Sequence, residues 1–225
     1  MEEQMTNLVK EYIEKNKIIA IVRGTYGKEL INLVSALEKG GIKLVEVTFD
    51  QSDPECLMKT SEAITILVEK FAGKMKIGAG TVLNEEQVET AHRAGAEYII
   101  SPNTNQQVIK KTKELKLVSI PGALTPSEIL EAHEMGADFV KIFPAGAHDL
   151  KYIKDIRGPI NHIKILATAG VTPDNLEDYL NVGFSGAGIS GYLTDKKLIT
   201  AGKFEMLTEH AKELMAIASD FDKGK

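Results

Sequence analysis

The chain has little cysteine, since Cys56 is the only one among its 225 residues. A single cysteine excludes an intrachain disulfide and a cysteine-rich zinc site. The five histidines are scattered, and no two of them have a ligand spacing such as H-x-H or H-E-x-x-H. The sequence therefore argues against metal catalysis, and Cys56, which falls in a helical pattern, is better explained as a small packing residue.

The chain also lacks a basic block and a long apolar run. Its formal net charge is −5, so neither nucleic acid nor an anionic membrane is a favoured partner. No apolar run approaches the ~20 residues needed to cross a bilayer. The first fifteen residues are polar, acidic and amphipathic, and they lack the apolar core of a signal peptide. We therefore expect a cytoplasmic enzyme or binding protein.

Apolar residues make up 43% of the chain, enough to bury a sizeable core. A helical pattern over Met5–Lys15 comes first, and eight strand-like runs then alternate with further helical patterns. Helix starts are predicted at Asp53-Pro54, Asn84, Thr125-Pro126 and Thr172-Pro173, each with a capping residue. The eight strand-like runs are Ile18–Val22, Lys43–Phe49, Lys76–Thr81, Glu97–Ser101, Leu117–Pro121, Asp138–Phe143, Ile163–Ala167 and Ser185–Ile189.

The junctions between helical patterns and strand-like runs repeat one device. Glycine falls just past the helical pattern and just before the next run at Gly41, Gly95, Gly136 and Gly183, where a left-handed backbone ends a helix at low cost. No linker divides the chain. We predict α/β architecture: a single domain, residues 1–225, folded as a (β/α)8 TIM barrel with a short N-terminal helix. The alternative, an open doubly wound sheet, would normally have fewer strands and a topological switch point.

One lysine, Lys141, lies inside the apolar run Asp138–Phe143. Burying an ammonium group costs several kcal/mol or lowers its pKa. A lysine with a lowered pKa can act as a nucleophile toward a carbonyl group. The alternative is a lysine near a strand end whose ammonium group reaches water. This stretch alone is consistent with both.

Glu46 lies between two valines in another apolar run. Active-site residues of a barrel lie at the carboxyl ends of its strands, so Glu46 and Lys141 are expected to face one interior. A buried carboxyl group has a raised pKa unless a cation pairs with it, and beside a lysine it supplies acid/base chemistry to the nucleophile. A buried ion pair that only holds the core is the alternative.

Other candidates also follow the predicted strands. Arg23 ends the first run, where it would either clamp a carboxylate or phosphate or form only a surface salt bridge. Two glycine-rich turns, Thr168-Ala169-Gly170 and Gly188-Ile189-Ser190-Gly191, follow the last two runs. Barrels often bind phosphate there through backbone N–H groups, although any tight turn uses glycine.

Five motifs occur in order along the chain: Glu46-Val47-Thr48, Gly78-Ala79-Gly80-Thr81-Val82, Ile100-Ser101-Pro102, Ile120-Pro121-Gly122 and Lys141-Ile142-Phe143-Pro144-Ala145. In this order and spacing they resemble the 2-keto-3-deoxy-6-phosphogluconate (KDPG) / 4-hydroxy-2-oxoglutarate (KHG) aldolase family. The resemblance implies a class I aldolase, a lyase in which a lysine forms a Schiff base with pyruvate and a glutamate moves protons through a water. It also implies a TIM barrel that assembles as a homotrimer and needs no metal or other cofactor.

By motif, Lys141 resembles the Schiff-base lysine and Glu46 resembles the general acid/base. The resemblance places Thr81 and Pro102 in a pyruvate pocket and Arg23 at the substrate carboxylate or the site mouth. The other substrate-binding residues that we expect are Thr48, Phe143, Thr168, Ala169, Gly170, Gly188, Ser190 and Gly191. The expected reaction cleaves KDPG to pyruvate and glyceraldehyde 3-phosphate, and also 4-hydroxy-2-oxoglutarate to pyruvate and glyoxylate.

The chain departs from the family pattern at three places. Ala169 stands where the family usually has glycine, Ser190-Gly191 reverses the usual Gly-Ser, and Asp50 stands where many members carry arginine. These departures leave the identity of the distal half of the substrate open. Two other interpretations remain: the same chemistry on a non-phosphorylated or differently configured 2-keto-3-deoxy acid, and a non-catalytic barrel that binds a keto acid or sugar phosphate.

Overall fold

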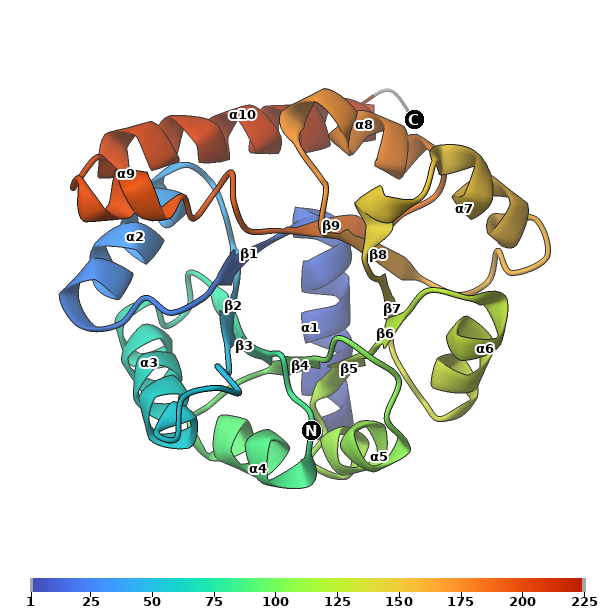
Figure 1. The fold of residues 1–225 in the computed structure, drawn as a ribbon, viewed down its shortest axis with the longest axis horizontal. Helices are drawn as coiled ribbons and strands as arrows, with labels where there is room; N and C mark the ends of the chain where they lie inside the picture. The colour runs from blue at the N-terminus through green and yellow to red at the C-terminus, as the bar shows by residue number, and fades with distance from the viewer. Residues whose placement is uncertain (1, 224–225) are drawn as a thin grey trace.

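The strands form one parallel sheet that curls into a ring (Figure 1). The structure is a computed structural model of the chain, and it describes residues 2–223. Their order around the ring is β5-β4-β3-β2-β1-β9-β8-β7-β6. The predicted barrel is therefore confirmed, and the open doubly wound alternative is wrong. The strands are β1 (Ile18–Val22), β2 (Leu44–Thr48), β3 (Lys76–Gly80), β4 (Tyr98–Ile100), β5 (Val118–Ile120), β6 (Gly122–Ala123), β7 (Val140–Ile142), β8 (Ile165–Thr168) and β9 (Gly186–Ile189).

The fifth predicted strand is divided at Pro121 into β5 and β6. Proline has no backbone N–H, so it cannot donate to the ladder. β5 pairs with β4, while β6 pairs with β7, so the divided strand joins the two ends of the sheet. The carbonyl of Pro121 still accepts a hydrogen bond from the N–H of Lys141 at 2.8 Å.

Helices surround the ring in Figure 1 and connect its strands. Thr125 caps α6 at the predicted start, where it forms a capping box with Glu128, and the Asn84 side chain caps α4. The predicted start at Asp53 is wrong: α3 begins at Cys56, and Asp53 Oδ1 instead accepts from the Glu55 N–H within the preceding turn. The helices are α1 (Glu2–Asn16), α2 (Gly27–Lys39), α3 (Cys56–Lys70), α4 (Glu85–Arg93), α5 (Gln106–Glu114), α6 (Pro126–Glu134), α7 (Leu150–Arg157), α8 (Pro173–Asn181), α9 (Lys196–Thr200) and α10 (Phe204–Lys223), with a 3-10 turn at Ala145–Ala147.

The barrel interior is closed at one end by α1, which crosses the ring in Figure 1. Val9 and Ile13 of α1 belong to the same buried cluster as the inward-facing side chains of the strands, among them Ile19, Tyr98 and Phe139. Alternate strand residues pack outward against the helices in a second cluster. A closed amino-terminal end leaves the carboxyl ends of the strands as the open mouth of the barrel.

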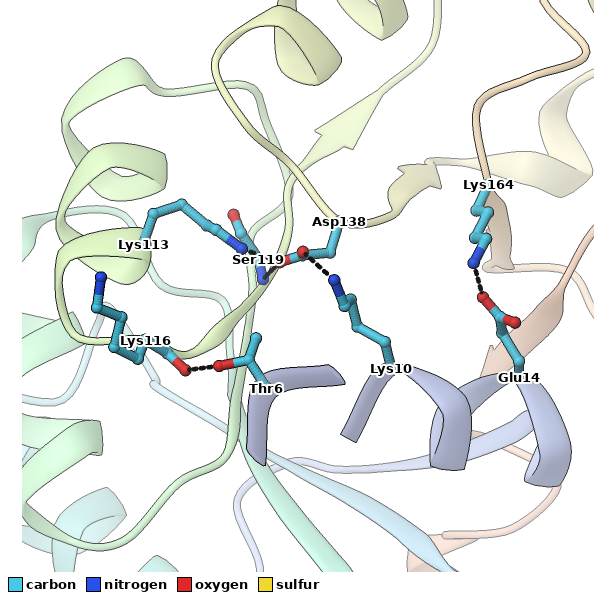
Figure 2. Close-up of polar contacts among 8 residues, drawn as sticks. All are labelled: Thr6, Lys10, Glu14, Lys113, Lys116, Ser119, Asp138 and Lys164. Atoms are coloured by element: carbon cyan, nitrogen blue, oxygen red, sulfur yellow. Dashed lines mark hydrogen bonds and ion pairs between the residues drawn. The ribbon is translucent and has the colours of Figure 1, made fainter. Parts of the chain in front are cut away.

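Polar contacts hold α1 against the strand ends that it covers (Figure 2). Asp138, which directly precedes Phe139 and β7, is largely buried and accepts from three directions. Its Oδ2 lies 2.6 Å from Lys113 Nζ and 2.9 Å from the Ser119 N–H, and its Oδ1 lies 3.5 Å from Lys10 Nζ. Asp138 thus joins α1 and α5 to the strand that carries Lys141.

We expect Asp138→Asn to lower the free energy of unfolding by about 1–3 kcal/mol, because the amide cannot replace the charge that both lysines face. Urea unfolding of the two proteins measures the difference. Asp155→Asn is the matched control, since Asp155 pairs with Lys151 at 2.7 Å on an exposed face and should change stability by less than about 0.5 kcal/mol. Equal losses in the two variants would contradict the proposed role of Asp138.

Candidate active site

Lys141 is buried in the barrel interior rather than extended to water. The alternation of β7 points it inward, because its neighbours Val140 and Ile142 belong to the outer cluster. Only 6% of Lys141 is exposed, and its Nζ lies 4.7 Å from the centre of the Phe143 ring. The interpretation of a solvent-reaching lysine is therefore wrong. Burial lowers the pKa of Lys141, an effect that the nearby carboxylate of Glu46 opposes.

Glu46 projects into the same interior from β2, and 2% of it is exposed. A Cβ atom on Gly80 would lie 1.6 Å from Glu46 Oε1, so the glycine of β3 makes room for the carboxylate. Burial raises the pKa of Glu46, while the positive charges of Lys141 and then Arg23 lower it. Glu46 Oε2 is fully buried and has no hydrogen-bond partner among the described residues.

Lys141 and Glu46 act on each other through their charges without touching. No nitrogen–oxygen distance of 4.0 Å or less joins them among the ion pairs of the described residues. A tight buried ion pair that only stabilises the core is therefore not what the interior holds. An amine of lowered pKa and a carboxyl group of raised pKa instead share the barrel interior, which we call the chamber, and this is the pattern of a nucleophile and an acid/base.

Arg23 and Thr81 meet at the rim of this chamber. Arg23 directly follows β1, is exposed, and donates from Nη2 to Thr81 Oγ1 at 3.5 Å. Thr81 has a φ of +55°, which a β-branched residue rarely adopts. Such strain persists where the surroundings impose it, and here Gln51 Nε2 donates to the Thr81 carbonyl at 2.8 Å. Gln87 holds Gln51 in turn, at 2.9 Å.

These two glutamines are supporting residues that sequence reasoning missed. Gln87 is a buried polar residue in the first turn of α4, and its Oε1 also accepts from the Leu83 N–H at 2.7 Å. Nothing in the sequence marks Gln51 or Gln87, because the glutamines lie 36 positions apart and meet only once β2 and β3 are adjacent.

The other expected pocket residues lie around the same mouth. Thr48 lies two residues after Glu46 on the same face of β2, and its buried Oγ1 has no partner within the described part of the chain. Thr168 ends β8 and is buried, and Phe143 follows β7 half-exposed above Lys141. Pro102 follows β4, where its carbonyl lies against Gly122.

The glycine-rich turns after β8 and β9 form one separate hollow of about 360 Å³. Ala169 has a φ of +69°, so it adopts the backbone usual for glycine, and its carbonyl accepts from the Gly146 N–H at 2.9 Å. A Cβ atom on Gly170 would lie 2.7 Å from Gly146 Cα. The hollow brings together the residues of the two predicted turns except Thr168; it is lined by Ala169, Gly170, Val171, Thr172, Gly188, Ile189, Ser190, Gly191 and Tyr192.

Asp50 lies outside the chamber, on the surface after β2. Its Oδ1 accepts from the hydroxyl and the N–H of Ser52, at 2.7 and 3.1 Å, and these hydrogen bonds lower the pKa of the Asp50 carboxyl. Across residues 2–223 no group of three histidine, cysteine or acidic residues is placed to hold a metal. Nor does any helix of this part combine the length and apolar character that crossing a membrane requires.

Comparison with known proteins points to one family. Residues 9–210 match the family model described as "KDPG and KHG aldolase". The chain is 34% identical over 180 residues to the 2-dehydro-3-deoxy-6-phosphogalactonate aldolase of Escherichia coli. This alignment covers 80% of this chain and 85% of that protein. It is 30% identical over 213 residues to the 2-dehydro-3-deoxy-phosphogluconate aldolase of Haemophilus influenzae, covering 94% and 97%.

The structural comparison agrees. The KDPG aldolase of Legionella pneumophila, solved with pyruvate captured as a covalent carbinolamine intermediate, superposes with a TM-score of 0.81 at 26% identity. The match covers 91% of this chain and 97% of that one.

Proposed function

This chain belongs to the KDPG and KHG aldolase family and is an aldolase, hence a lyase, and we propose that it cleaves a 4-hydroxy-2-keto acid to pyruvate through a Schiff base on Lys141. The observation that carries the proposal is the burial of Lys141 and Glu46 in one chamber without an ion pair between them. The lowered pKa of Lys141 raises the fraction of neutral amine, which is the form that attacks a carbonyl. Class I chemistry needs such an amine.

The proposed reaction uses the side chains of Lys141 and Glu46 together with water. The Lys141 amine adds to the keto carbon to give a carbinolamine, and uptake of one proton from solvent lets its hydroxyl leave as water, which gives a protonated imine. The bond between C3 and C4 then breaks, its electron pair moves to the imine, and the proton of the 4-hydroxyl passes to Glu46. The aldehyde leaves, Glu46 protonates the enamine at C3, and water hydrolyses the protonated imine to release pyruvate, the free lysine amine and the proton that was taken up when the imine formed.

Surrounding residues would bind and orient the substrate. We propose that Thr81 and Pro102 contact the pyruvate half and that Arg23 faces its carboxylate or the mouth of the site, where Arg23 already donates to Thr81. The buried hydroxyl of Thr48 is placed to add a further contact beside Glu46. We also propose that residues 1–225 are one aldolase domain that works in the cytoplasm and assembles as a homotrimer; only the homotrimer comes from the family resemblance.

The proposed substrate is KDPG, cleaved to pyruvate and glyceraldehyde 3-phosphate, with 4-hydroxy-2-oxoglutarate as a second substrate. The epimer of KDPG at C4 is a specific alternative substrate, because the Escherichia coli relative is named as an aldolase of the galactonate compound. A panel of both phosphorylated epimers, their non-phosphorylated counterparts and 4-hydroxy-2-oxoglutarate would rank them by kcat/KM.

The direct test of the mechanism is covalent capture. We expect borohydride added to the protein with pyruvate to leave a reduced pyruvate adduct on Lys141, located by peptide mass spectrometry. Omitting pyruvate is the control. An adduct on a different lysine would contradict the proposed nucleophile, and reversible pyruvate binding without any adduct would favour a non-catalytic binding barrel.

A further inference from the structure

A second hollow lies beside the turn after β9, and its lining is strongly charged. It has a volume of about 400 Å³ and lies between the end of β1 and the start of α9. Three of its lining residues are cationic and one is acidic: it is lined by Arg23, Ser190, Gly191, Thr194, Asp195, Lys196 and Lys197. The hollow after β8 shares Ser190 and Gly191 with it but has no charged side chain in its lining.

Lys196 reaches across this hollow toward the first strand. Its Nζ lies 3.6 Å from where a Cβ atom on Gly24 would be, and Gly24 directly follows Arg23. The single carboxylate of the lining forms no ion pair with these cations among the described residues; Asp195 Oδ1 instead accepts from the backbone N–H groups of Lys197 and Leu198, at 2.7 and 3.2 Å. None of the ion pairs found within residues 2–223 includes Arg23 or Lys196.

The position of Arg23 joins this hollow to the reactive chamber. Arg23 lines the hollow, and its Nη2 donates to Thr81 Oγ1 at 3.5 Å; its positive charge also lowers the pKa of both Glu46 and Lys141. The opposite wall is fixed by Thr194, whose hydroxyl bonds the Ile21 and Ser190 carbonyls at 3.1 and 3.0 Å. The cationic hollow therefore lies beyond the carboxyl ends of β1 and β9, at the same end of the barrel as the open mouth.

We infer that Lys196, together with Arg23, receives the phosphate group of the aldehyde half of the substrate, which assigns Arg23 to the mouth of the site rather than to the carboxylate of the pyruvate half. Lys196 thereby sets the preference for phosphorylated over non-phosphorylated 2-keto-3-deoxy acids. Arg23 and Lys196 both line this hollow, so a phosphate dianion placed there gains from both positive charges, whereas a neutral hydroxyl gains from neither. The inference rests on the proposed function, because it assigns the far end of the same site. It also supplies a charged contact for the phosphate in a chain where Ala169 replaces the usual glycine of the turn after β8.

The test compares substrates rather than total activity. We expect Lys196→Met to lower the ratio of kcat/KM for a phosphorylated 2-keto-3-deoxy acid over that for its non-phosphorylated counterpart by about tenfold or more. Lys196→Arg should keep most of the ratio, because the charge remains. Lys203→Met removes an exposed lysine outside the hollow and is the matched control. The wild-type ratio should also fall as salt is added, since exposed charges are screened.

The outcomes separate this inference from the proposed function. Capture of pyruvate by borohydride on Lys141 tests the function alone, and Lys196→Met should still give the adduct because pyruvate carries no phosphate. If the adduct forms while Lys196→Met leaves the ratio unchanged, the assignment of Lys196 is wrong and the function stands. If Lys196→Met lowers kcat/KM equally for the phosphorylated and the non-phosphorylated acid, the assignment of Lys196 is also wrong. A wild-type protein without any preference for the phosphorylated acid would overturn the assignment as well. A fall on 4-hydroxy-2-oxoglutarate alone would assign Lys196 to a distal carboxylate and contradict the phosphate assignment.

Discussion

Replacing Lys141 with methionine is expected to reduce kcat/KM for retro-aldol cleavage by about 10⁴-fold or more. Methionine keeps the length and the apolar stem of the side chain but has no amine to form the imine. Without the imine, the C3–C4 bond has no acceptor for its electrons, and losses on this scale follow removal of a covalent nucleophile in other enzymes. Steady-state assays on the substrate panel would measure the loss.

The matched control for this variant is Lys164→Met. Lys164 immediately precedes β8 at the end of the barrel that α1 closes, where it pairs with Glu14 (Figure 2). We expect this variant to keep its kcat and its pyruvate adduct. Full activity in Lys141→Met would contradict the proposed mechanism outright.

The Lys141→Met substitution should not destabilise the fold. Burial lowers the pKa of Lys141 from its ordinary 10.5, so the unfolded chain binds this proton more tightly than the folded chain. Below its folded pKa the charged lysine therefore costs folding free energy, and the cost fades as the pH rises toward 10.5. We expect Lys141→Met to be at least as stable as the wild type at neutral pH. Lys141→Met/Glu46→Gln should be more stable by about 1–4 kcal/mol, because it replaces two buried charges with neutral groups.

The arrangement of the barrel follows from local patterns, which is why it could be predicted from the sequence. The eight apolar runs each contain or overlap a strand, and the predicted helix-ending glycines, such as Gly95 and Gly136, have positive φ angles. The errors are also local. α9 spans only five residues, too short for a periodic signal, and the turn that Asp53 caps resembles a helix start in sequence.

The candidate site could be predicted only in part, because burial and proximity depend on which strands become neighbours. The sequence alone was consistent with Lys141 either reaching water or facing the interior, and the closed ring places it in the interior. Lys196 approaches Gly24 because β1 and β9 pair, a contact between residues more than 170 positions apart. The strained backbone of Thr81 and the glutamine pair that supports it likewise exist only after the strands are assembled.

Glu46→Gln is expected to lower kcat by about 10²–10⁴-fold while leaving the imine chemistry in place. Glutamine fits the space that Gly80 leaves for the carboxylate, but it cannot take the proton of the 4-hydroxyl or return one to C3. Lys141 keeps its amine, so borohydride with pyruvate should still give an adduct on Lys141. A variant that loses the adduct completely would show that Glu46 is needed to form the imine, which contradicts a role confined to proton transfer.

The pH dependence of this variant separates proton transfer from a structural role. In the wild type, kcat/KM should rise with pH as the coupled pair loses protons, because burial raises the pKa of Glu46 and lowers that of Lys141. The carboxylate of Glu46 opposes the lowering at Lys141, so Glu46→Gln should remove the Glu46 titration and move the Lys141 titration to lower pH. Glu97→Gln removes a carboxylate that pairs with Lys76 at 2.6 Å, outside the chamber, and should leave both kcat and the profile unchanged. A Glu46→Gln profile that coincides with the wild-type profile would mean that Glu46 does not titrate with Lys141, and the assignment of Glu46 as the acid/base would then be wrong.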